Sequence, residues 1–152
     1  EKELAPLTSA VSVHPMIWVL DAELKRAQGQ LASALALYQS GVKRFPSHRA
    51  LGYGYADVLN TLKRYNEAVR FISEQLKLRP KDDKYLELQA RAYGGLQKNF
   101  LSHRALAEAY AQRGNLTAAV EQLQIALKSG ETVARYGSGA NVVKPLAPRT
   151  RP

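Results

Sequence analysis

Histidine offers the broadest catalytic and metal-binding chemistry in this chain of 152 residues, which has three histidines and no cysteine. His14, His48 and His103 are widely separated, whereas an HExxH zinc peptidase places two histidines on one face of one helix so that both reach the metal. The sequence has no such pair and no serine in a GxSxG motif, and its lack of cysteine excludes thiolate catalysis. We therefore interpret the histidines as surface or helix-cap residues at loops or helix starts.

Glycine and carboxylate pairs do not indicate a catalytic site either. Gly94 and Gly95, and the GSG segment at 137–139, lack the flanking strand and the lysine of a phosphate-binding loop, so we predict turns or helix ends there. Asp82 and Asp83 stand at the start of a predicted helix, where carboxylates cap free N–H groups and are favoured by the helix dipole. We therefore predict that this chain is not an enzyme by itself.

An internal repeat dominates the arrangement of the predicted helices. Ala34 and Ala68 have the same separation along the chain as Pro46 and Pro80. Small residues let two antiparallel helices approach each other, and proline stops the second helix. This pattern and its period resemble the tetratricopeptide repeat (TPR), a helix hairpin of about 34 residues. The predicted fold class is all-α, a TPR helix-hairpin array or α-solenoid of about seven antiparallel helices.

The third repeat is displaced by half a period. The segments at 88–97 and 106–116 both have the pattern of a first helix, yet Tyr93 and Tyr110 are separated by only half the distance between Ala34 and Ala68. Since consecutive antiparallel helices alternate between two layers, we predict that a helix at 100–113 occupies the outer layer. A last helix at 116–128 then closes the array.

The predicted domain organisation has three parts. Residues 1–14 form an N-terminal arm or short helix, residues 15–130 form the TPR array, and residues 131–152 form a basic tail rich in glycine and proline. The array divides into 15–48, 49–82 and 83–130, with the half-repeat offset in the last part. No apolar run approaches the ~20 residues of a membrane-spanning helix. Because the sequence starts with glutamate and shows no leader pattern, we expect a fragment of a longer protein.

The formal net charge of +9 is concentrated in the tail and in the middle of the chain, where residues 43–81 contain nine basic and three acidic residues. Several of these cations come in pairs, such as Lys43 with Arg44 and Lys63 with Arg64, near the predicted ends of helices. Cations there complement the carbonyl groups at helix C-termini. We favour this structural interpretation, while a polyanion-binding patch and a protein-docking patch remain open.

A helix-hairpin array presents a concave groove that can hold an extended peptide or a partner helix. The repeat phase directs one side of each first helix into this groove, including the positions of Gly54, Asn60 and Leu88. The candidate residues for binding a peptide or partner are Glu23, Arg26, Tyr53, Asp57, Lys84, Glu87 and Arg91.

These seven residues contain three cations and three anions, which argues against nucleic acid, a ligand that needs a track of cations and stacked aromatic rings. Of the lysine and asparagine positions typical of carboxylate-clamp TPR modules, only Lys84 fits. We expect Tyr53 and Arg91 to contact a ligand directly. The alternative, in which Tyr53 only packs against Val19 or Leu88, stays open.

Residues 97–130 are similar to the C-terminal repeat region of the bacterial periplasmic zinc metallopeptidases that include the β-barrel assembly-enhancing protease. The shared pattern is A-E-x-Y-x-x-x-G-x-L-x-x-A-x-x-x-L, found here at Ala107, Glu108, Tyr110, Gly114, Leu116, Ala119 and Leu123. The resemblance covers about residues 15–130. It implies that an HExxH domain precedes this chain, and that the repeats dock on it and affect access to its active site.

The resemblance also implies a location and partners. We expect a periplasmic protein whose zinc belongs to the absent peptidase domain, with no cofactor in this chain, because no position here matches the metal ligands of the family. The expected partners are proteins or peptides, including the peptidase domain itself and outer-membrane assembly factors, with no nucleic acid. The alternative is a stand-alone TPR scaffold or adaptor for bacterial protein assembly.

Overall fold

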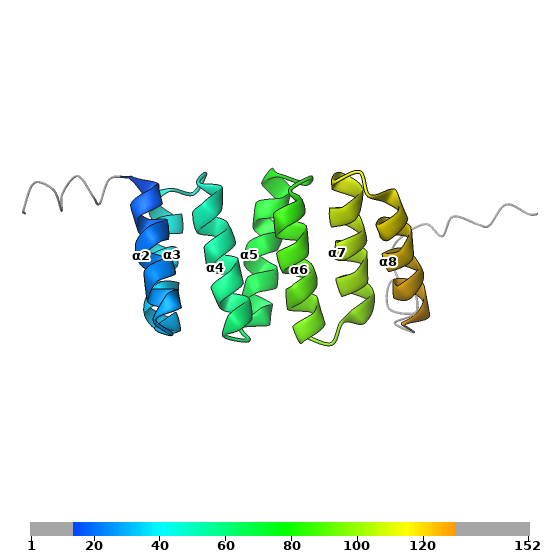
Figure 1. The fold of residues 1–152 in the computed structure, drawn as a ribbon, viewed down its shortest axis with the longest axis horizontal. Coiled ribbons are helices and arrows are strands. Elements are labelled where there is room, and N and C mark those ends of the chain that lie inside the picture. The colour runs from blue at the N-terminus through cyan, green and yellow to red at the C-terminus, as the bar shows by residue number, and fades with distance from the viewer. Residues whose placement is uncertain (1–13, 130–152) are drawn as a thin grey trace, which may run out of the picture.

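The computed structural model describes residues 14–129, which form seven α-helices and no strand (Figure 1). The predicted tail at 131–152 and all of the predicted arm except His14 lie outside the described residues. The helices are α2 (Pro15–Ala27), α3 (Leu31–Arg44), α4 (Arg49–Thr61), α5 (Tyr65–Leu78), α6 (Asp83–Gly95), α7 (Asn99–Gln112) and α8 (Leu116–Lys128). They follow the long axis of the molecule in chain order, which confirms the predicted all-α array of about seven helices.

Capping residues set the starts of several helices. The Nδ1 atom of His14 accepts a hydrogen bond from the backbone N–H of Met16 at 3.2 Å, and the side chain of Asp82 accepts one from the backbone N–H of Tyr85. Both residues therefore satisfy N–H groups that have no partner within the helix. The predicted capping roles of His14 and Asp82 are confirmed.

Large side chains fill the space between the first five helices. Tyr38, Leu51, Ile72 and Tyr85 are almost completely buried, together with small residues such as Ala34 and Ala68. Two glycines of α4 make room for the aromatic rings, because a Cβ atom on Gly54 would overlap the ring of Tyr38, and one on Gly52 would overlap the Tyr85 hydroxyl. The glycine-rich segment at 52–55 thus lets α4 approach both aromatic side chains closely.

Two kinds of turn connect the helices. The turns that follow α3 and α5 contain Pro46 and Pro80, whereas the turns after α2, α4, α6 and α7 each hold one residue with φ between 58° and 76°. In the turn after α2 the N–H of Gly29 bonds the carbonyl oxygen of Arg26 at 3.0 Å, and after α7 the N–H of Gly114 bonds that of Ala111 at 3.0 Å. Helices α6, α7 and α8 are therefore joined by two successive turns of one kind, whereas the two kinds alternate from α2 to α6.

The first helices of the hairpins form one continuous surface. Helix α2 packs against α4, and α4 packs against α6, while α7 packs against α6 and α8. The surface carried by α2, α4 and α6 is called the inner face below. The turn that pairs α7 with α6 is of the kind that pairs α3 with α2, and the outer-layer position of α7 stays a prediction. Within residues 14–129, no helix is both long and apolar enough to cross a membrane.

Candidate functional site

The inner face carries all seven candidate residues, and Asp57 of α4 joins its three helices. The Oδ2 atom of Asp57 pairs with Nη1 of Arg26 on α2 at 2.6 Å. The other carboxylate oxygen of Asp57 accepts a hydrogen bond from Arg91 on α6. The folded array therefore brings Arg26 and Arg91 to one carboxylate, although they are 31 and 34 positions from Asp57 in the sequence.

Glu23 extends this network into the core. Its Oε2 atom pairs with Nη2 of Arg26 at 2.8 Å, and its Oε1 atom accepts a hydrogen bond from the hydroxyl group of Tyr38 at 2.5 Å. Burial raises the pKa of Tyr38, and the bond to Glu23 raises it further, so the hydroxyl stays protonated. The four charged residues of this network, two acidic and two basic, sum to zero.

A second charge network lies at the start of α6. Arg113, in the turn between α7 and α8, donates hydrogen bonds of 2.6 Å to both Asp83 and Glu87. These bonds hold the pKa values of both carboxyl groups below their usual range. Lys84 stands 4.0 Å from Glu87, so this network is also balanced. Sequence reasoning missed Arg113 because it lies outside the first helices, just before Gly114 of the displaced repeat.

Tyr53 lies partly buried where α4 meets α6. Its hydroxyl group donates to the carboxylate of Asp82, with distances of 2.8 and 3.0 Å to the two oxygens. The Tyr53 ring meets the edge of Tyr85, with 4.7 Å between the ring centroids. Burial and the bond to Asp82 raise the pKa of Tyr53 to about 12. Its polar end is thus already paired within the protein.

Three positions placed in the groove by the repeat phase are buried between helices instead. Gly54 faces the ring of Tyr38, while Asn60 and Leu88 are 4% and 3% exposed. The side-chain amide of Asn60 donates to the backbone carbonyl of Leu88 at 3.0 Å and so links α4 to α6. These residues hold the inner face together and do not line a groove.

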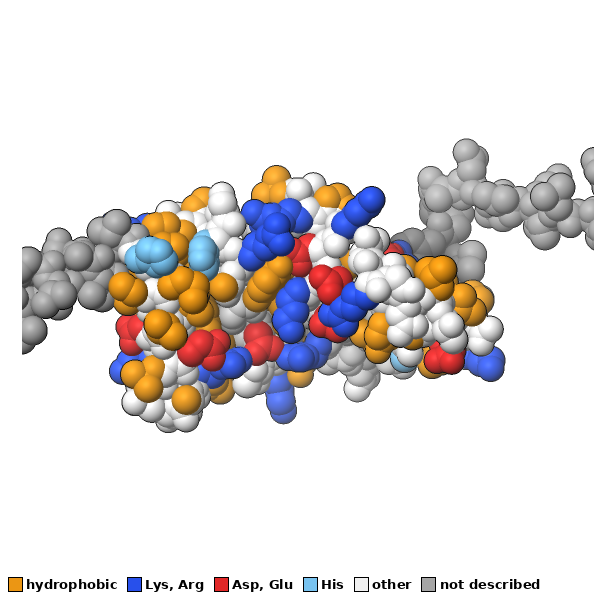
Figure 2. Space-filling view, turned by 45° about the horizontal axis from the view of Figure 1, so that its top comes forward, with side chains coloured by type: hydrophobic (Ala, Val, Ile, Leu, Met, Phe, Trp, Pro, Cys, Tyr) orange, Lys and Arg blue, Asp and Glu red, His pale blue; other side chains and the backbone are white. Residues whose placement is uncertain are grey.

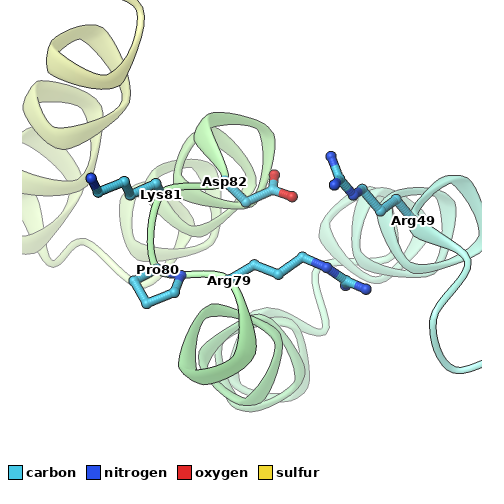
Figure 3. Close-up of a pocket in the computed structure, with 5 residues that line it drawn as sticks. All are labelled: Arg49, Arg79, Pro80, Lys81 and Asp82. Atoms are coloured by element: carbon cyan, nitrogen blue, oxygen red, sulfur yellow. The ribbon is translucent and has the colours of Figure 1, made fainter.

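A pocket of about 410 Å³ lies at one edge of the inner face, between the start of α4 and the turn from α5 to α6 (Figure 3). It is lined by Arg49, Arg79, Pro80, Lys81 and Asp82. In Figure 3 the side chains of Arg79 and Asp82 point toward the side where Arg49 lies, and Lys81 points the opposite way. None of these residues was among the seven predicted binding residues, although Lys77, Arg79 and Lys81 form a basic run that is visible in the sequence.

A second pocket, of about 490 Å³, lies between α6 and α7. Glu87 and Arg91 line it with Ser102 and Leu106 of α7, so it includes two of the predicted site residues. The hydroxyl group of Ser102 is bound to the backbone carbonyl of Ala90 at 2.8 Å. A second hollow therefore borders the inner face on its α7 side.

The described residues hold no group of three or more histidine, cysteine, aspartate or glutamate side chains placed to bind a metal ion. His14 and His48 precede α2 and α4 as N-cap residues. His103 was expected at a loop or helix start but lies inside α7, with its Nδ1 atom 2.8 Å from Oε1 of Gln122 on α8.

Comparisons with known proteins agree on one architecture. Residues 25–92 match the family model described as tetratricopeptide repeat. The structure is similar to the first TPR domain of the human RPAP3 protein, solved by NMR, with a TM-score of 0.64 and 17% identity over 76% of this chain and 91% of that chain. It is also similar to MamA 41-end from Desulfovibrio magneticus RS-1, with a TM-score of 0.51 and 16% identity over 76% and 75% of the two chains. A comparison with curated protein sequences gives no significant match.

The matched segment runs from the end of α2 to α6, the part in which the repeat period is regular. Within it, Ala34 of α3 and Ala68 of α5 occupy equivalent positions, and both are fully buried. At 17% and 16% identity, the likeness to these two solved structures concerns the fold. The described residues of this chain form a TPR helix-hairpin array.

Proposed function

We propose that this chain is a non-catalytic module that binds a partner polypeptide across its inner face. The observation that carries the proposal is the network of Glu23, Arg26, Asp57 and Arg91, which runs over three helices at the surface. The side chains of Arg26 and Arg91 are 38% and 62% exposed. They remain accessible to a ligand even while paired.

Such exposed ion pairs stabilise a fold weakly, by about 0–1 kcal/mol each, because water screens them and two long side chains must be ordered. A partner that offers carboxylates, carbonyl groups or N–H groups can therefore replace the internal pairing at little cost. Figure 2 shows basic and acidic side chains interleaved across the middle of this side of the molecule. Because the charges alternate, the surface suits a polypeptide with mixed polar groups better than a polyanion.

In its more specific form, the proposal makes this chain the C-terminal repeat region of a periplasmic zinc metallopeptidase. The pattern from Ala107 to Leu123 supports it, together with the two successive turns of one kind on either side of α7. In this proposal the zinc and its ligands belong to a peptidase domain before Glu1. The repeats then position substrates or outer-membrane assembly factors and affect access to the active site.

The partner surface can be tested by site-specific crosslinking in cells. A photoreactive amino acid replaces Lys84 on the inner face and, as a control, Lys77 on α5, two exposed lysines. We expect crosslinks to a protein partner from position 84 and few from position 77, with identification by mass spectrometry. Equal crosslinking from both positions would contradict a partner site on the inner face.

The metallopeptidase form has a separate test, which is the coding sequence before Glu1. An HExxH helix there supports this form, whereas an unrelated domain would leave a stand-alone or differently attached scaffold. Neither result changes the expectation for crosslinking. The binding surface and the identity of the parent protein are therefore tested independently.

A further inference from the structure

The pocket between α4 and the α5–α6 turn differs in charge from the rest of the inner face. Both ion-pair networks are balanced, one through Asp57 and the other through Arg113. In contrast, the pocket is lined by three basic residues and one acidic residue. Among residues 14–129, no carboxylate forms an ion pair with Arg49, Arg79 or Lys81.

The carboxylate of the one acidic residue in this pocket is hydrogen-bonded to uncharged groups. Asp82 accepts hydrogen bonds from the hydroxyl group of Tyr53 and from the backbone N–H of Tyr85. Arg79 donates one bond to the backbone carbonyl of Ser47 at 3.2 Å and has further N–H groups to offer. Arg49 also interacts with the hydroxyl group of Tyr53, and each of the two arginines keeps further N–H groups to offer.

Helix α4 adds to the positive potential of the pocket. Arg49 is the first residue of this helix, and the N-cap residue His48 makes no side-chain hydrogen bond to its free N–H groups. The N-terminal end of a helix carries a partial positive charge, which favours nearby anions. Two guanidinium groups, which can each bind a carboxylate through two parallel hydrogen bonds, therefore border the pocket at this end.

We propose that this pocket binds a side-chain carboxylate from an acidic segment of the partner protein. This inference rests on the proposed function and adds a chemical preference to it. Arg49 and Arg79 hold one carboxylate in the pocket, and Lys81, which points the opposite way in Figure 3, meets a second acidic residue of the same segment. A run of two or more Asp or Glu residues fits this arrangement better than a single terminal carboxylate.

The surroundings favour a peptide over a nucleic acid. A nucleic acid needs a continuous track of unpaired cations and exposed aromatic rings on which bases stack. Here Arg26, Arg91 and Arg113 of the two ion-pair networks are paired with carboxylates. The nearby rings of Tyr53 and Tyr85 pack against each other, and Tyr85 is 1% exposed. Three cations without an ion-pair partner, Arg49, Arg79 and Lys81, thus gather at one pocket, which suits a short acidic stretch.

Fluorescence anisotropy with the full chain tests the proposal. The probe is a fluorescein-labelled hexaglutamate peptide with acetylated and amidated ends, and a hexaglutamine peptide with the same ends is its reference. We expect the double variant Arg49→Gln with Arg79→Gln to bind hexaglutamate at least about tenfold more weakly, since charge-assisted bonds to both guanidinium groups are lost. Lys81→Gln has a smaller effect in the same direction.

A matched control separates the pocket from general charge attraction. The double variant Lys43→Gln with Arg70→Gln removes the same number of charges from exposed positions on α3 and α5. We expect it to bind hexaglutamate within about twofold of the wild type, because these positions are outside the pocket. Circular dichroism and melting curves must show that both double variants fold. If Arg79→Gln alone disturbs folding, Arg49→Gln and Lys81→Gln carry the comparison.

Several outcomes would overturn the proposal. One is an equal loss of binding in the two double variants, and another is equal binding of hexaglutamate and hexaglutamine by the wild type. A third is that hexaglutamine binds as soon as its C-terminal amide is replaced by a free carboxylate. Tighter binding of a hexathymidylate oligonucleotide, lost in the same pocket variant, would make the site a polyanion site instead. If the partner crosslinked at position 84 is retained by the pocket variant, only this inference fails. If no partner is crosslinked, the proposed function fails.

Discussion

The two halves of the array bury different kinds of side chain. The largest fully buried residues, namely Tyr38, Leu51, Val58, Leu59, Ile72 and Tyr85, all lie on α3 to α6. The buried residues of α7 and α8 are all alanines. On α8, five large apolar side chains are exposed, Leu116, Val120, Leu123, Ile125 and Leu127. The regular repeats are held by large interlocking side chains, and the displaced half-repeat by close approach of small residues.

This difference concerns stability as well as shape. Burial of large apolar side chains contributes roughly 1.5–3 kcal/mol per residue, and alanine contributes much less. In a helical array each helix is supported mainly by its neighbours, so weakly supported ends open first. We expect α8 to open locally at lower free energy than α3 to α6, which hydrogen exchange can measure.

The largest contrast is expected from truncating apolar side chains in the two halves. Ile72→Ala removes a fully buried side chain from α5 and should lower the free energy of unfolding by about 2–5 kcal/mol. Leu123→Ala removes one that is 45% exposed on α8 and should change it by less than about 1 kcal/mol. Urea denaturation gives both values. Comparable losses would show that α8 is as tightly packed as α5.

A smaller contrast separates two glycines. Gly54→Ala places a Cβ atom into the buried ring of Tyr38 and should cost about 1–3 kcal/mol through overpacking. At Gly94 the nearest atom to a new Cβ is Oγ of Ser102 on α7 at 3.5 Å, an ordinary contact. Gly94→Ala should therefore be neutral or stabilise by up to about 1 kcal/mol, because alanine is the better helix former. Thermal melting should show a lowered Tm for Gly54→Ala and an unchanged or raised Tm for Gly94→Ala, and a loss at both sites would contradict the free space beside Gly94.

The repeated turn allows a third test across both halves. Lys63 and Gln97 have φ values of 59° and 58°, in the left-handed region that is strained for side-chain-bearing residues, and Gly114 occupies the same turn position with φ of 76°. Gly114→Ala should cost about 1 kcal/mol, and Lys63→Gly should stabilise by roughly half as much, since glycine also gains entropy when unfolded. Chemical denaturation would measure both. A stabilising Gly114→Ala change would mean that the α7–α8 turn is not equivalent to the others.

Periodicity in the sequence predicted the helices well because it reports on burial. The spacing of Ala34 with Ala68 and of Pro46 with Pro80 reflects contacts that recur in each hairpin, and the spacing of Tyr93 with Tyr110 predicted the offset. The partners of the charged residues could not be predicted in this way. The repeat phase predicts the helix face on which a side chain lies. The ion-pair partners of a long side chain depend on interatomic distances in the folded structure.

Two examples show where this limit lies. The repeat phase predicted only the helix face of Tyr53, whereas its bond to Asp82 depends on the turn after α5, whose position follows from tertiary packing. Arg113 reaches Asp83 and Glu87 only because α7 folds back along α6, and the two partners are 30 and 26 residues away in the sequence. The basic run near Pro80 was visible in the sequence, but its convergence with Arg49 required the structure.

The smallest expected effect comes from the charges that join the two halves. Arg113 ties the α7–α8 turn to the start of α6, and its partners Asp83 and Glu87 have lowered pKa values in the folded state. Groups with lowered folded pKa values add stability at a pH above their unfolded pKa, and this stability is lost as pH falls through the folded values. Arg113→Gln should therefore cost less than about 1 kcal/mol at pH 7, since water screens these partly exposed groups.

The pH dependence is what distinguishes this loss from a general effect of the substitution. The difference between wild type and Arg113→Gln should shrink as pH falls below roughly 4, where carboxylates take up protons in the unfolded chain and then in the folded one. Arg104→Gln breaks only a pair within α7, with Glu108 at 3.3 Å, and serves as the control. Its effect should be smaller, because a pair within one helix contributes about 0.3–0.5 kcal/mol. A pH-independent loss in Arg113→Gln would mean that its side chain stabilises the junction by packing, and the charge link between the halves would then be wrong.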